Sequence, residues 1–119
     1  MQVHGLQVAD IAGRFDDDWC EGHVRVRVVS ECVCTRLKLG VWIPNDNEEV
    51  PIGVFTITAG DRPPITRVVK TGDPQDLSVP AHLNPGDEFS FTIECDYKIK
   101  KDAKDTRELA FVLTSAVLM

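Results

Sequence analysis

Residues 105–113 read Asp105-Thr106-Arg107-Glu108-Leu109-Ala110-Phe111-Val112-Leu113, and this stretch decides the fold class. Its apolar residues alternate, so that Leu109, Phe111 and Leu113 share one face of an extended strand. Val117 and Met119 continue the same alternation toward the end of the chain. The pattern therefore predicts a β-strand over residues 108–118 whose last residues are built into a hydrophobic core.

Similar alternating runs recur along the whole chain, and each is bounded by glycine, proline, aspartate or asparagine. Helical periodicity is almost absent. The runs predict eight strands, at residues 3–9, 23–29, 36–43, 52–58, 65–70, 76–79, 88–95 and 108–118. Eight short strands with turns between them predict an all-β fold, an antiparallel β-sandwich of about eight strands. Because no linker or internal repeat interrupts the 119 residues, we expect a single domain over residues 1–119.

The alternation also predicts which side chains face the core. In the second predicted strand the core-facing residues are Val24, Val26 and Val28, so Arg25 and Arg27 face solvent. In the third predicted strand the core-facing residues are Leu37, Leu39, Val41 and Ile43. Trp42 then points away from the main core. An outward tryptophan is covered by a loop, such as residues 16–21, or it contacts a partner or a ligand.

The net charge and the hydropathy of the chain argue against some classes of binding partner. The formal net charge of −6 argues against a nucleic-acid or anionic-membrane surface, because such binding depends on Lys and Arg that neutralise phosphates. No apolar run approaches the roughly 20 residues that span a bilayer. Met1 is followed by no basic segment with an apolar segment after it. We therefore expect a cytoplasmic protein that binds neither nucleic acid nor membrane.

Four cysteines, Cys20, Cys32, Cys34 and Cys95, could form disulfides in three pairings. In a cytoplasmic protein we expect them to be free thiols that pack as small hydrophobic side chains. Cys32 and Cys34 lie one residue apart, a spacing that suits neither a mutual disulfide nor a zinc knuckle. A metal site that combines these cysteines with His23 is the less favoured alternative.

The acidic run Asp16-Asp17-Asp18 is a candidate calcium site, because hard cations prefer carboxylate oxygens. Consecutive aspartates point in different directions, however, and the run lacks the spacing of an EF-hand loop. We favour a solvated acidic turn, and we predict no metal and no cofactor.

The order of these features resembles that of a known family. The features are a Trp-containing turn at residues 15–23, a strand that ends in an aromatic residue and a proline at residues 37–44, the turn Pro85-Gly86-Asp87, and the final strand with its Asp105-Thr106-Arg107-Glu108-Leu109-Ala110-Phe111 motif. This order is similar to that of the small accessory β-sandwich domains found beside bacterial glycosyltransferases, whose last strand commonly carries an Asp-x-Arg-Glu-Leu-Gly-Phe-like motif. Ala110 stands here in place of the usual glycine. The resemblance implies a jelly-roll-like or galactose-binding-like sandwich, a glycosyltransferase partner and a non-catalytic role near carbohydrate.

The candidate ligand-binding residues are Trp42, Trp19, Arg107, Asp105, Glu108 and His23. Trp42 comes first, because an indole face stacks on the apolar face of a pyranose and the alternation aims this residue outward. Trp19 lies in a polar turn, where it either pins the turn to the sandwich or contacts the ligand. The charged cluster near residue 107 either fixes a loop by ion pairs or, if it faces a groove with His23 or Trp19, hydrogen-bonds sugar hydroxyls.

Catalytic motifs are missing from the sequence. It contains no nucleophile elbow, no His-Glu-x-x-His, no phosphate loop and no convincing Ser-His-Asp or Cys-His set. A paired-carboxylate glycosidase stays open, because its two acids can come from any strands, but short loops leave little room for a cleft. We therefore predict that the chain is not an enzyme but a non-catalytic, carbohydrate-associated binding module. The alternative is a structural protein–protein interaction or homo-oligomerisation module, in which the face with Trp42, Arg25 and Arg27 is the interface and no sugar binds.

Overall fold

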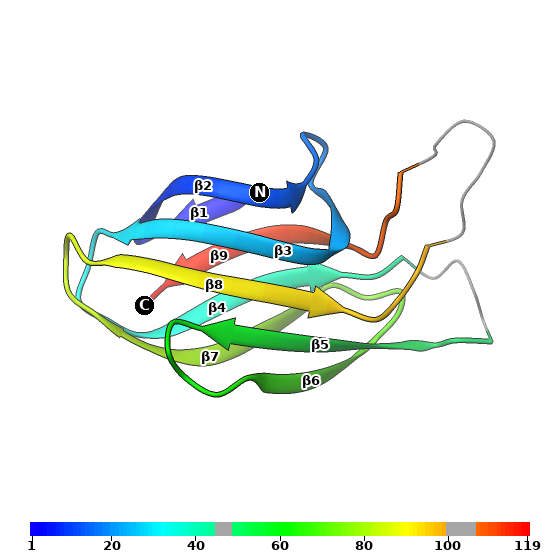
Figure 1. Cartoon of the computed structure of the whole chain (residues 1–119). Coiled ribbons are helices and arrows are strands. Elements are labelled where there is room, and N and C mark those ends of the chain that lie inside the picture. The colour runs from blue at the N-terminus through cyan, green and yellow to red at the C-terminus, as the bar shows by residue number, and fades with distance from the viewer. Residues whose placement is uncertain (45–48, 100–106) are drawn as a thin grey trace.

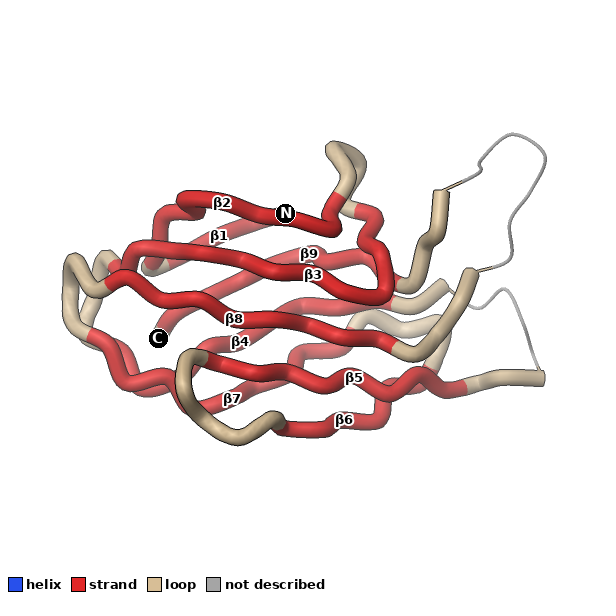
Figure 2. Tube along the Cα trace, viewed as in Figure 1, coloured by secondary structure: helices blue, strands red, loops and turns tan. Residues whose placement is uncertain are grey.

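The computed structural model of the chain describes residues 1–44, 49–99 and 107–119 (Figure 1). Within these ranges every regular element is a β-strand, so the predicted all-β class is confirmed (Figure 2). The part of the chain that the structure describes contains no helix long and apolar enough to cross a membrane. The strands are β1 (Gln2–His4), β2 (Leu6–Arg14), β3 (Trp19–Ser30), β4 (Cys34–Trp42), β5 (Ile52–Ala59), β6 (Ile65–Lys70), β7 (Gln75–Leu83), β8 (Glu88–Cys95) and β9 (Phe111–Leu118).

These nine strands form one continuous sheet. Its order is β6-β5-β8-β3-β9-β4-β7, with β1 added beside β9 and β2 beside β3. All pairs are antiparallel except β1 with β9, which are parallel. The sheet curls so that β3, β8 and β5 lie in front of β9, β4 and β7 in Figure 1, and the two ends of the order, β6 and β7, come close together. The sheet is therefore nearly closed into a barrel.

The expected antiparallel sandwich of about eight strands is not confirmed, because β3 joins the two layers. Residues 23–29 of this long strand pair with β8, whereas Trp19 and Cys20 at its beginning pair with β9. Hydrogen bonding therefore passes from the front layer to the back layer without a break.

The core lies between the two layers and agrees with the predicted faces. Val24, Val26 and Val28 of β3 have no exposed surface. The same is true of Leu37, Leu39, Val41 and Ile43 in and after β4. Phe55 and Phe111 meet edge to face across this core, with 5.0 Å between their ring centroids.

The first predicted strand, residues 3–9, is in fact two strands that are separated at Gly5. This glycine has φ +77°, and a Cβ built on it would lie 2.4 Å from the carbonyl oxygen of Leu118. Only glycine adopts such a conformation at no steric cost. The break lets β1 pair with β9 while β2 pairs with β3.

The prediction that Val117 and Met119 face the core is wrong. Met119 is 56% exposed, whereas Leu118 and Ala116 are buried. The cause is a bulge in β9 at Thr114, which is an extra residue between the pairs Gly40 with Ser115 and Val41 with Leu113. One extra residue moves every later side chain to the other face of the sheet.

Candidate functional site

The strand register places both tryptophans on one outward face. Trp19 of β3 pairs with Val112 of β9, and Trp42 of β4 pairs with the same valine from the other side. Directly paired residues project from the same side of a sheet. The neighbouring pair, Cys20 and Phe111, is fully buried in the core, so the side chains of Trp19, Val112 and Trp42 point outward. We call these three residues the tryptophan row.

The row has a defined spacing. Adjacent strands lie about 4.8 Å apart, so two strand intervals separate the backbones of the two tryptophans by about 10 Å. Val112 between them is only 9% exposed, whereas Trp19 and Trp42 are half-buried. Each indole therefore keeps part of its surface accessible to solvent.

A turn fixes the indole of Trp42. Its Nε1–H donates a hydrogen bond of 3.0 Å to the carbonyl oxygen of Gly72, and the amide of Gly72 donates one of 2.7 Å to Ile43. The loop that holds Trp42 is thus the turn between β6 and β7 and not residues 16–21, as the sequence suggested. A side chain that is held before binding loses less entropy when a ligand arrives.

Asp18 organises the turn before Trp19. It has φ +68°, a conformation that aspartate tolerates better than most residues. Its carboxylate accepts two hydrogen bonds of 2.7 Å from the amino group of Met1 and another from Arg14. These contacts, with the Met1 amino group first and Arg14 second, hold the pKa of Asp18 below its usual value.

Arg107 ties the same turn to the segment before β9. Its guanidinium lies 3.0 Å from the carboxylate of Asp17 and 4.7 Å from the ring centroid of Phe15. The hydrogen bond from Arg107 is the largest cause of a lowered pKa of Asp17. The ion pair of Arg107 is thus with Asp17, and the cluster with Asp105 and Glu108 that the sequence offered as a loop-fixing alternative stays a prediction.

The Asp16 to Asp18 run is therefore engaged in ion pairs at two of its three positions. In the described ranges, no three His, Cys, Asp or Glu side chains are grouped as metal ligands. Of the remaining predicted site residues, Glu108 is exposed just before β9, and Asp105 lies outside the described residues.

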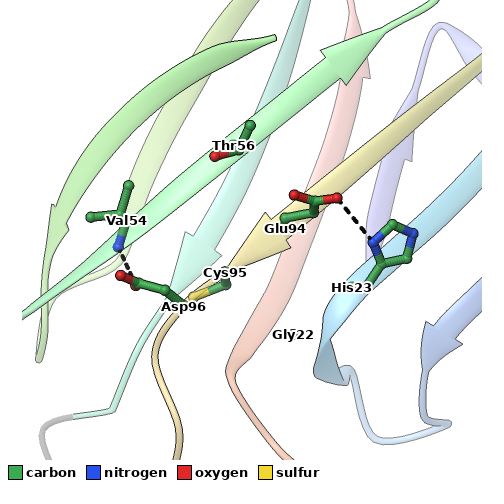
Figure 3. Close-up of a pocket in the computed structure, with 7 residues that line it drawn as sticks. All are labelled: Gly22, His23, Val54, Thr56, Glu94, Cys95 and Asp96. Carbon is green, nitrogen blue, oxygen red and sulfur yellow. Dashed lines mark hydrogen bonds and ion pairs between the residues drawn. The ribbon is translucent and has the colours of Figure 1, made fainter.

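His23 is separated from the tryptophan row. It lies four residues beyond Trp19 on β3, about 13 Å along the strand. There it lines a cavity of about 340 Å³ with Gly22, Val54, Thr56, Glu94, Cys95 and Asp96 (Figure 3). The Nδ1 of His23 is 3.3 Å from Glu94 Oε1, and the side chains are 61% and 57% exposed. An ion pair this open to water contributes little energy.

The chemistry of this cavity does not favour covalent catalysis. Its thiol belongs to Cys95, and burial raises the pKa of that thiol to about 11. The thiol is thus protonated at neutral pH, whereas a nucleophilic cysteine needs a thiolate. Asp96 is used structurally, because its Oδ1 accepts a hydrogen bond of 2.7 Å from the amide of Val54.

The interface expected from the sequence is not a single surface. Arg25 and Arg27 project outward from β3 in the front layer, and Trp42 projects outward from β4 in the layer behind it (Figure 1). These residues therefore lie on opposite sides of the shared core.

Comparisons of the chain with known protein families, with curated proteins and with solved structures found no match. The resemblance to accessory domains of glycosyltransferases therefore stays a prediction.

Proposed function

We propose that the chain is a non-catalytic accessory domain that binds carbohydrate through the tryptophan row. The observation that carries this proposal is the placement of Trp19 and Trp42 on one outward face, on either side of Val112. An indole presents a large apolar face that stacks on the apolar face of a pyranose. Two such faces about 10 Å apart suit a linear oligosaccharide better than a single sugar.

The surroundings of the row support a neutral ligand that is held by stacking. The indole of Trp42 is held by Gly72, and Trp19 follows a turn that is fixed by the ion pairs of Asp18 and Arg107. Rigid aromatic side chains of this kind provide contact area at a low cost in conformational entropy. Polar groups for the sugar hydroxyls are available beside the row in Thr114 and Ser115 of β9, which are exposed and half-buried.

The architecture, partner and location that the resemblance implies fit a carbohydrate-binding accessory domain. We infer that the nine-stranded curled sheet is a variant of the jelly-roll-like or galactose-binding-like architecture, and that a glycosyltransferase is the functional partner. A cytoplasmic location is consistent with four cysteines that are separate thiols, three of them buried.

A glycan array with the purified domain tests the proposal. We expect binding to a linear oligosaccharide, with Trp19→Ala and Trp42→Ala each weakening it by about tenfold or more, which corresponds to about 1.4 kcal/mol. Trp42→Phe, which keeps a ring but removes the hydrogen bond to Gly72, should retain more affinity than Trp42→Ala. His23→Ala is the matched control, because His23 is also outward on β3 but distant from the row.

Sedimentation of the same variants separates the sugar proposal from its alternative. If the row binds sugar, Trp42→Ala leaves the molecular mass in solution unchanged. A shift from oligomer to monomer in Trp42→Ala, with no glycan bound by the wild type, would show that the row is a protein interface.

A further inference from the structure

A second pocket lies on the outer side of β7, beside the unpaired gap between β6 and β7. Its volume is about 540 Å³. The polar residues that line it are Thr35, Arg36, Arg67, Ser78 and His82. We call it the seam pocket. It is distinct from the tryptophan row, because Arg36 is six residues, about 20 Å, from Trp42 along β4.

The charge of the seam pocket is opposite to that of the chain. The protein has 19 acidic residues against 13 lysines and arginines, yet no carboxylate is among the described residues that line this pocket. Arg36 of β4 and Arg67 of β6 line the pocket from the two sides of β7, and the guanidinium of Arg67 donates one hydrogen bond of 3.0 Å to the carbonyl oxygen of Thr66. Lys38 pairs directly with Ser78 but lies outside the lining. The nearest acid along β7, Asp76, is two residues away from Ser78 and outside the lining.

Ser78 supplies an unsatisfied donor. Its Oγ is shielded from solvent and, among the described residues, has no hydrogen-bond partner. Buried hydroxyl groups are normally paired, because an unpaired one loses its bonds to water without replacement. Ser78 also lines the pocket, so an acceptor bound there is a possible partner for this hydroxyl.

A purely structural role explains only part of this arrangement. Arg67 pairs with the buried Phe55, so its side chain projects from the inner face of β6. Pro80 has no amide hydrogen, so β7 lacks a backbone hydrogen-bond donor at that position. Inward charges and prolines protect open sheet edges from pairing with other chains. That role accounts for Arg67, but it requires neither Arg36 nor the unpaired hydroxyl of Ser78.

We propose that the seam pocket binds a phosphate or sulfate group. Guanidinium groups match the oxygens of such anions with paired hydrogen bonds, and the hydroxyls of Ser78 and Thr35 are further donors. The inference is independent of the proposed sugar binding. The group is carried either as a free anion or on a larger molecule.

Titration of the ¹⁵N-labelled protein tests this proposal. The probes are inorganic sulfate, inorganic phosphate and glucose 6-phosphate, each added at constant ionic strength that is maintained with potassium chloride. We expect saturable shifts of the backbone amides of Arg36, Arg67 and Ser78. Arg36→Gln and Arg67→Gln should each weaken binding by about tenfold, the loss expected for one charge-assisted contact.

Arg25→Gln is the matched control, because it removes the same charge from an exposed position on β3 in the other layer. Saturation by the inorganic anions would identify a free anion as a sufficient ligand, and saturation by glucose 6-phosphate alone would identify a group carried on a larger molecule. The proposal is overturned if none of the three probes saturates, if the two seam variants bind as the wild type does, or if Arg25→Gln weakens binding equally.

Discussion

Phe111, the first residue of β9, anchors this strand in the hydrophobic core. It has no exposed surface, and its ring meets that of Phe55 edge to face. Phe111→Ala should lower the free energy of unfolding by about 3–5 kcal/mol, because it empties a site that the surrounding core can only partly refill. Phe111→Leu keeps most of the volume and should cost less than Phe111→Ala. Urea denaturation of the three proteins measures the difference, and an unchanged midpoint for Phe111→Ala would contradict this assignment.

Asp18 makes stability depend on pH. Because the Met1 amino group and Arg14 lower its pKa in the folded state, its carboxylate stabilises the fold above the usual carboxyl pKa of 3.8. That contribution is lost as the pH falls through the lower, folded-state pKa. Asp18→Asn should therefore reduce the urea midpoint at pH 7, and the two proteins should converge at a pH well below 3.8. A difference that is the same at both pH values would show that the charge is not the cause.

The cysteines differ in their expected reactivity. Burial raises the pKa of Cys20 to about 12 and that of Cys95 to about 11, and it also raises the pKa of Cys34. Cys32 is half-buried. We expect a thiol reagent to modify Cys32 first in the native protein and all four cysteines after denaturation without reductant. Fewer than four reactive thiols in the denatured protein would show that a disulfide had formed.

At the scale of elements, the division of β1 from β2 depends on Gly5. Gly5→Ala would place a Cβ in a left-handed conformation and 2.4 Å from the Leu118 carbonyl oxygen. Gly86→Ala is the matched control, since Gly86 has φ +88° but open space around it. Both variants should lose about 1 kcal/mol or more from the backbone conformation, and Gly5→Ala should lose more than Gly86→Ala. Thermal unfolding compares them, and equal losses would show that the contact with Leu118 is unimportant.

The alternation in the sequence predicts the strands well because it reflects local side-chain direction. It identifies the buried faces of β3 and β4 correctly, down to Val26 and Leu39. It fails at Gly5 and Thr114, where the backbone changes direction or gains a residue because of the strand it pairs with. The two-residue alternation of apolar side chains describes one strand at a time, so it does not predict how segments far apart in the chain pair.

The candidate site shows the same division between local and long-range information. The sequence draws attention to Trp19 and Trp42 one at a time, and the period-2 pattern aims Trp42 outward. It does not show that Val112 lies between them, because that depends on the registers of β3, β9 and β4 together. It also misses the seam pocket, whose arginines come from strands that are far apart in the chain.

For the whole molecule, the curl of the sheet creates both proposed sites. Continuity from β3 to β9 aligns the tryptophan row, and the near approach of β6 to β7 forms the seam pocket. The two sites are about 20 Å apart along β4, so substitutions in one should leave binding at the other unchanged. Each proposal can therefore be tested with the other site intact.

Carbohydrate binding by the tryptophan row is tested most directly by the two indole N–H signals in a ¹⁵N spectrum, recorded while the array-selected oligosaccharide is added. The chain has two tryptophans, so Trp19 and Trp42 account for both signals. If the tryptophan row binds carbohydrate, both signals shift and saturate with the same dissociation constant, and in Trp42→Ala the Trp19 signal saturates only at an oligosaccharide concentration about tenfold higher or more. If the oligosaccharide binds while both indole signals stay in place, the tryptophan row is not the carbohydrate-binding site.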